Sequence, residues 1–170
     1  MKLLTALAAA LVLNFGVINS MDAAAPQEKG SNIMAIEDFS TVFARGGKND
    51  AYAQYFVGQS YLNMLSLEQV VIGNVTFEPG CRNNWHIHKA AKGGGQILLV
   101  TGGRGYYQEW GKEPRELHPG DVVNIPTGVK HWHGAAPNSW FAHLAIEVPG
   151  EETSNEWCEP VSDEEYNKLK

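Results

Sequence analysis

Apolar residues from position 51 onward fall into short β-like runs that glycine and proline separate. The separating turn signals include Pro79-Gly80, Gly102-Gly103 and Pro119-Gly120. The pattern predicts nine strands, over residues 52–58, 60–65, 70–77, 83–88, 96–101, 104–110, 121–125, 130–135 and 139–148. Short strands at this spacing are typical of an all-β sandwich, jelly roll or barrel.

Helical patterns are found toward the two ends of the chain. Ile36, Phe39 and Phe43 would share one face of a short helix before Gly46-Gly47. Near the C-terminus, Ser162 and Glu165 have the spacing of a capping box, which predicts one short helix there. No repeat of 20–50 residues is visible, so we expect a single β domain with a short C-terminal helix.

Composition narrows the class of protein further. With 170 residues, of which 44% are hydrophobic, the chain has room for one domain with a sizeable core. Its net charge is −6, and it contains no basic run. Nucleic-acid binding depends mainly on neutralising phosphates, so this charge argues against a nucleic-acid partner.

The N-terminus resembles a targeting segment. Lys2 precedes an apolar stretch, Leu3 to Val17, that is too short and interrupted to span a bilayer. We expect a signal peptide over 1–22, an N-terminal extension over 23–50 and the main domain over 51–170. The protein would then be exported, to the periplasm or beyond; the alternative is a buried N-terminal helix.

The chain has two cysteines, Cys81 and Cys158, whose spacing excludes a CxxC motif. An oxidising compartment would permit a disulfide between them. Two unrelated thiols fit the sequence equally well.

All six histidines lie between residues 86 and 143. In a strand, residues two apart share a face, so His86 and His88 point to one side, as do His131 and His133. His143 follows on the next predicted strand. A closed barrel can direct these five imidazoles at one interior point, where they would form a metal site.

Gln96 opens an apolar run and shares a face with Leu98 and Val100. A buried amide requires a polar partner, because burying it without a hydrogen bond is costly. A metal ion would provide that partner.

These residues resemble the two motifs of the cupin superfamily, Gly-x5-His-x-His-x(3,4)-Glu-x6-Gly and Gly-x5-Pro-x-Gly-x2-His-x3-Asn. The first is matched over residues 80–103 and the second over 120–131. Gln96 stands where Glu is usual, and Ala135 replaces the final Asn. The segment 89–95 lengthens the first motif, like a loop inserted at the barrel mouth. The resemblance implies a single-domain cupin jelly-roll barrel.

From about residue 52 onward the chain also resembles small bacterial cupins. That group includes manganese-dependent hydroxynitrile lyases, also called cupin mandelonitrile lyases, and cupins associated with carboxymuconolactone decarboxylases. The resemblance implies a metal-dependent lyase acting on a small hydroxy or carbonyl compound, and a homodimer or larger assembly. It implies metal ligands at His86, His88, Gln96 and His131, and substrate-facing residues at His133 and His143.

Several alternatives stay open. Three imidazoles and an amide oxygen suit Mn, Fe, Co, Ni or Zn, with Mn favoured by the resemblance. An Fe-dependent oxygenase, or a cupin that binds a small molecule or metal without catalysis, would use the same residues. For the assembly, we expect interface strands within residues 52–65, which are aromatic at one end and carry no charge.

Overall fold

A computed structural model describes residues 34–169, which are mostly strand with a short C-terminal helix. The expected signal peptide over 1–22 and the first part of the expected extension lie outside this range. Within residues 34–169, no helix is long and apolar enough to cross a membrane.

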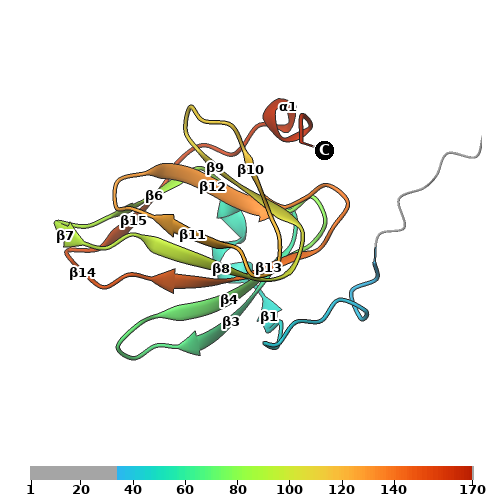
Figure 1. The fold of residues 1–170 in the computed structure, drawn as a ribbon, viewed down its shortest axis with the longest axis horizontal. Helices are drawn as coiled ribbons and strands as arrows, with labels where there is room; N and C mark the ends of the chain where they lie inside the picture. The colour runs from blue at the N-terminus through green and yellow to red at the C-terminus, as the bar shows by residue number, and fades with distance from the viewer. Residues whose placement is uncertain (1–33, 170) are drawn as a thin grey trace, which may run out of the picture. The chain divides into compact units, whose positions relative to one another are not determined.

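Two antiparallel sheets form the jelly roll that the sequence predicts (Figure 1). The first has the order β1 (Gly47–Lys48), β3 (Ser60–Ser66), β4 (Ile72–Phe77), β13 (Phe141–Glu147), β8 (Gln96–Gly103) and β11 (Val122–Ile125). The second has the order β10 (Arg115–Leu117), β9 (Gly105–Glu109), β12 (Lys130–Ala135), β5 (Arg82–Asn83) and β2 (Phe56–Val57). Both sheets pair strands that are distant in sequence, such as β4 with β13 and β5 with β12.

Four further strands extend this framework around the loop expected at 89–95. Strand β6 (His86–Lys89) pairs with β12 on one side and with β15 (Ser154–Trp157) on the other. Within the loop, β7 (Lys92–Gly93) pairs with β14 (Gly150–Glu151) as a separate two-stranded sheet. Strands β14 and β15, which follow β13, therefore pair with the loop and with the strand that carries His86 and His88.

Seven of the nine predicted strands are confirmed to within a few residues, and two predictions are wrong. The strand expected over 83–88 is interrupted at Asn84 and Trp85, which separate β5 from β6. The strand expected over 52–58 is mostly a 3₁₀ helix, η1 (Asp50–Tyr55), followed by the two residues of β2. The backbone N–H of Tyr52 donates to the Asn49 carbonyl at 3.2 Å, which begins this helix. Three-residue spacing then places Tyr52 and Tyr55 on one side of it.

The short helix expected around Ile36 to Phe43 is also wrong. A single turn lies at residues 36–38, closed by the N–H of Asp38 on the Ala35 carbonyl at 3.1 Å. Phe39 instead stacks on Trp140, with ring centroids 5.5 Å apart. Phe39 is thus held by packing on Trp140, and not by the apolar face of a helix that the sequence pattern predicted.

At the other end, the helix α1 (Asp163–Tyr166) begins after Ser162, as the capping box predicts. The Ser162 hydroxyl accepts the N–H of Glu165 at 3.1 Å. Tyr166 is buried, and its hydroxyl donates to the Ala135 carbonyl of β12 at 2.6 Å. This contact anchors the C-terminal segment to the second sheet.

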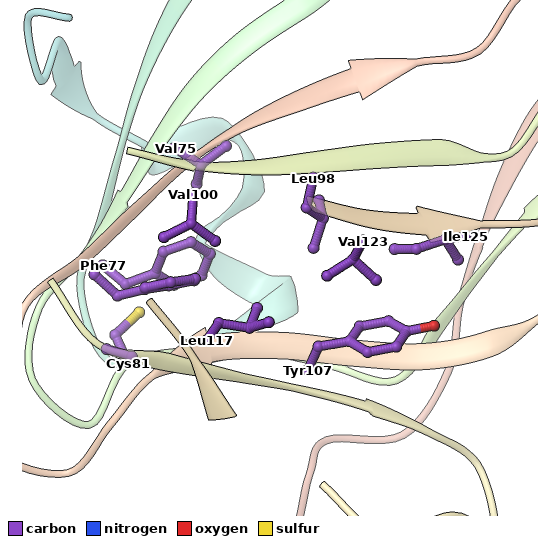
Figure 2. Close-up of a cluster of buried hydrophobic side chains, with 11 residues drawn as sticks. Val75, Phe77, Cys81, Leu98, Val100, Tyr107, Leu117, Val123 and Ile125 are labelled. Atoms are coloured by element: carbon purple, nitrogen blue, oxygen red, sulfur yellow. The ribbon is translucent and has the colours of Figure 1, made fainter. Parts of the chain in front are cut away.

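A cluster of buried hydrophobic side chains fills much of the space between the sheets (Figure 2). We call it the core cluster: Val75, Phe77, Cys81, Leu98, Val100, Tyr107, Leu117, Val123, Ile125, Ala135 and Phe141. Cys81 belongs to it and Cys158 is half-buried elsewhere; both are free thiols, so the disulfide is not formed. Burial raises the pKa of Cys81 to about 12, as expected of an inert core thiol.

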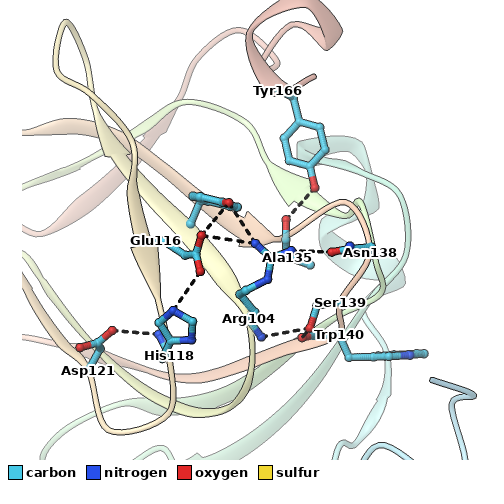
Figure 3. Close-up of polar contacts among 10 residues, drawn as sticks. Arg104, Glu116, His118, Asp121, Ala135, Asn138, Ser139, Trp140 and Tyr166 are labelled. Carbon is cyan, nitrogen blue, oxygen red and sulfur yellow. Dashed lines mark hydrogen bonds and ion pairs between the residues drawn. The ribbon is translucent and has the colours of Figure 1, made fainter. Parts of the chain in front are cut away.

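A surface network of polar side chains surrounds Arg104 (Figure 3). The Arg104 guanidinium donates to the Tyr106 hydroxyl at 3.1 Å, to Glu116 at 3.3 Å and to Asn138 at 2.5 Å. His118 Nε2 lies 2.9 Å from the other oxygen of Glu116. These contacts join the β9–β10 hairpin to the turn before β13.

Candidate metal centre

Five buried histidines from three strands lie together inside the jelly roll. They are His86 and His88 on β6, His131 and His133 on β12, and His143 on β13, each exposed by 4% or less. His86 and His131 are cross-strand partners, and their ring centroids are 4.1 Å apart. We call these five residues the histidine cluster.

Backbone carbonyls fix the orientation of two of these rings. Nδ1 of His86 lies 3.0 Å from the Asn84 carbonyl, and Nδ1 of His131 lies 2.9 Å from the Val129 carbonyl. A carbonyl only accepts, so the proton of each neutral ring is on Nδ1 and its Nε2 keeps a lone pair. Nε2 of His131 is buried without a hydrogen-bond partner.

A carboxylate takes the place of the carbonyl at the third ring. Nδ1 of His88 lies 3.2 Å from Oε2 of Glu147, and Nε2 of Gln96 donates to Oε1 of Glu147 at 2.7 Å. Both ring nitrogens of His88 and Oε1 of Gln96 are buried without a hydrogen-bond partner, so Nδ1 of His88 meets Glu147 at ion-pair distance only. Buried acceptors without partners are costly, and imidazole nitrogen and amide oxygen are ordinary metal ligands. A divalent metal therefore fits the groups that are present.

His133 has different surroundings. Nδ1 of His133 lies 3.0 Å from Nε2 of His143. The Asn83 amide nitrogen lies 3.3 and 3.1 Å from the two ring nitrogens of His133, and since a neutral ring has one lone pair, it can donate to only one of them. One nitrogen each of His86, His131 and His133 lie within 4.8 Å of one another, close enough to share an ion. By distance alone, His133 thus competes with His88 for a place among the ligands.

Four of the five imidazoles of the cluster, His86, His131, His133 and His143, are neutral at neutral pH. Burial lowers the pKa of His131 and of His143 to about 4, and it lowers the pKa of His86 and His133 well below the usual value. Neutral imidazoles are the form that binds metals or accepts protons. Burial alone would raise the pKa of Glu147, but its contacts with His88, Gln96 and His131 together outweigh burial and lower that pKa, which keeps the carboxylate ionised.

A cavity of about 430 Å³ reaches the cluster, at His86, His88, His133 and Gln96. His131 and His143 are completely buried behind it. Much of its wall is apolar or aromatic, including Tyr52, Phe56, Leu62, Met64, Val71, Val75, Ala145, Val148 and Trp157. Such a cavity fits a small and largely apolar molecule that brings one polar group to the histidines.

The inserted loop over 89–95 lies beside this cavity, and Lys89 and Gly95 line it. Gly93, Gly94 and Gly95 all have positive φ, between 65° and 95°. A Cβ on Gly95 would lie 2.4 Å from the Ile125 carbonyl oxygen, so this turn requires glycine. The loop is thereby folded against β14, and Gln96 begins β8 immediately after it.

Three residues of the site were not expected from the sequence: Asn83, Glu147 and Trp157. Glu147 lies four residues after His143 on the same strand, so two-residue periodicity placed it on the same face. The Trp157 ring stacks on Tyr55, with ring centroids 4.4 Å apart, and lies tilted against His86, with centroids 4.9 Å apart. Trp157 ends the short polar strand β15, and no spacing in the sequence relates it to the histidines.

Comparisons with known proteins agree with this geometry. The cupin domain family matches residues 73–143, which include all five residues of the histidine cluster. The chain is 47% identical over 95 residues to an (R)-mandelonitrile lyase of Granulicella tundricola, a match that covers 56% of this chain and 70% of that protein. Among solved structures, it resembles a cupin-like protein of Thermotoga maritima with a TM-score of 0.66 and 39% identity, covering 76% of this chain and 97% of the other.

Proposed function

This chain belongs to the cupin superfamily, and on that premise we propose that it is a metal-dependent lyase acting on a small hydroxynitrile. One observation carries the proposal: buried lone pairs without partners lie together beside a cavity of substrate size. The similarity to an (R)-mandelonitrile lyase favours cleavage of a hydroxynitrile over the other reactions open to such a site.

In this proposal the metal ligands are His86, His88, Gln96 and His131. Each of the three rings has its Nδ1 within 3.2 Å of an oxygen, by a hydrogen bond at His86 and His131 and at ion-pair distance at His88, which leaves Nε2 for the metal. We place His133 outside the ligand set on the resemblance to the hydroxynitrile lyases, because its Nδ1 contact with His143 does not by itself exclude it. Mn²⁺ is the metal we favour, although the donor set also suits Fe, Co, Ni or Zn. When bound, a divalent ion supplies a Lewis acid that polarises an oxygen of the substrate.

His133 is the proposed base. It lines the cavity and is neutral, so its Nε2 can accept the hydroxyl proton of a hydroxynitrile. As that proton leaves, the oxygen forms the aldehyde carbonyl and the carbon–carbon bond breaks, and its electron pair departs with cyanide. His143 accepts the Nδ1 proton of His133 in a hydrogen bond, and it stabilises the imidazolium that forms. Cyanide then takes up the proton as hydrogen cyanide.

Metal analysis together with a turnover assay tests this proposal. We expect one divalent transition metal per purified chain, and release of benzaldehyde and cyanide from mandelonitrile that chelation abolishes and Mn²⁺ restores. Stoichiometric metal with oxygen uptake on phenols, and no lyase turnover, would favour the oxygenase. Absence of metal would favour a binding protein without catalysis.

We further propose export and dimerisation. Export depends on the N-terminal pattern and is tested by cell fractionation with N-terminal sequencing of the mature protein. For the dimer, Tyr52, Met64, Leu65 and Leu67 are exposed within or beside the expected segment 52–65. Light scattering of the mature chain should give twice the monomer mass or more, and a monomer would contradict this.

A further inference from the structure

Glu147 connects two proposed ligands that lie on different strands. It is the cross-strand partner of Gln96, at the end of β13 that faces the start of β8. Each of its oxygens lies against a different neighbour: Oε1 accepts from Gln96, and Oε2 lies 3.2 Å from Nδ1 of His88, at ion-pair distance. The Glu147 side chain is 38% exposed and lines the cavity, whereas His88 is 4% exposed.

We infer that Glu147 is a positioning residue, which fixes the tautomer of His88 and the amide orientation of Gln96 so that both present lone pairs to the metal. The inference rests on the proposed metal site. His86 and His131 obtain the same control from backbone carbonyls, which no substitution of a side chain removes. At His88 and Gln96 the control depends on one side chain and can be changed by mutation.

The chemistry of the acceptor supports this role. A neutral imidazole carries one proton, and a ring protonated on Nε2 has no lone pair there for a metal. A flipped Gln96 would likewise present its NH₂ group instead of its oxygen. A carboxylate only accepts, so Glu147 is satisfied by both neighbours only when each is in its metal-binding form.

Glu147 also compensates for a departure from the cupin motif. Gln96 occupies the position where the motif has Glu, so three imidazoles and an amide bring no charge to the ion. Glu147 places one negative charge directly across the strand pair from Gln96, behind the ligands. Such outer carboxylates typically change metal affinity by roughly 10–100-fold when they are removed.

Glu147→Gln is the sharpest test, because the substituted amide has one accepting oxygen and one donating nitrogen. It can satisfy only one of its two neighbours, so either His88 changes tautomer or Gln96 flips. We expect the Kd for Mn²⁺, titrated into metal-free protein by calorimetry, to rise about 10–100-fold. Glu147→Asp keeps two accepting oxygens and should recover part of the affinity.

Glu156→Gln is the matched control, since it removes the same charge from a residue that pairs with Lys89 beside His88. It should change the Kd for Mn²⁺ less than about twofold, because Glu156 contacts neither His88 nor Gln96 through its side chain. Circular dichroism of each metal-free variant checks that the fold is retained. A Glu147→Gln variant that binds Mn²⁺ within twofold of the wild type overturns the inference.

A second readout does not require metal binding. Histidine ¹⁵N shifts of the metal-free wild type should show His88 protonated on Nδ1, and Glu147→Ala should give a mixture of tautomers. An unchanged tautomer in Glu147→Ala overturns the role of Glu147. Failure of the wild type to bind Mn²⁺ would instead remove the proposed function, while the tautomer measurement still decides what Glu147 does.

Discussion

The core cluster and the histidine cluster occupy the same barrel at the same depth, yet they differ in how complete their interactions are. Leu98 and Phe141 are fully buried, and so are His131 and His143. Apolar side chains need only close packing, which burial supplies. Burial deprives an imidazole of water, and here it leaves Nε2 of His131 and His88 without a partner. Equal depth therefore has different consequences in the two clusters. Close packing satisfies the apolar side chains of the core cluster, whereas the histidine cluster keeps lone pairs without a partner.

The surface network around Arg104 shows that this chain can satisfy polar groups where it has no ligand to bind. Its guanidinium contacts Tyr106, Glu116 and Asn138. Buried polar atoms without a partner also occur elsewhere, at Asn74, Thr101 and Tyr107, but the histidines and Gln96 bring several of them to one site.

The largest effect should come from removing two ligands at once. His86→Ala combined with His88→Ala should reduce bound metal from one equivalent to almost none, since half of the proposed donors are lost. Elemental analysis measures this. The folded state should survive, because the core cluster is untouched. Full retention of metal in the double variant would contradict the ligand assignment.

His133→Ala should separate catalyst from ligand. We expect metal content to stay near one equivalent while mandelonitrile turnover falls by about 10²–10⁴-fold, the usual contribution of a positioned base. His131→Ala, two residues away, should lose the metal as well. Loss of metal in His133→Ala would instead assign His133 to the ligands, as its distance to His86 and His131 allows.

Leu117→Ala makes the opposite change, in the core cluster. Leu117 is fully buried on β10, so its truncation should lower the free energy of unfolding by about 2–5 kcal/mol. Urea denaturation measures the loss. Metal content per folded chain should match the wild type. A parallel loss of metal would mean that the two clusters are not independent.

Acidification should lower stability gradually through the histidine cluster. The pKa of His131 and of His143 is about 4 in the folded chain, below the unfolded value of 6.5, so the unfolded state binds more protons at low pH. Stability of the metal-free protein should be constant above about pH 7 and fall as the pH drops from 6.5 toward 4. The expected loss at pH 5.5 is about 1.4 kcal/mol for each histidine. Leu117→Ala should show the same pH dependence from a lower starting point; a flat profile would contradict the buried neutral state.

The strands could largely be predicted from sequence because glycine and proline mark their ends and apolar runs fill them. The failures have physical causes in tertiary contacts. Tyr55 ends a 3₁₀ helix where a strand was expected. Its ring stacks on Trp157, which lies about 100 residues later in the chain. Strand β15 is short and polar, and it forms because β6 offers it an edge.

The candidate site was predictable where its residues repeat a spacing. Two His-x-His pairs predict convergence on one strand face each, and the five imidazoles do lie together. The roles of Asn83 and Glu147 depend on cross-strand neighbours, which a linear pattern does not specify. Gln96 keeps its place despite the lengthened loop because β7 and β14 pair with each other and absorb the added residues.

Strand β15 has a consequence for the order of events during synthesis. His86 and His88 leave the ribosome early, but β6 gains its second neighbour only when residues 154–157 have been made. His131, His143, Glu147 and the Trp157 ring that covers His86 also belong to the last quarter of the chain. The pocket is therefore assembled only after residues 154–157 have been made, so an ion can be captured in its finished coordination only once strand β15 is in place.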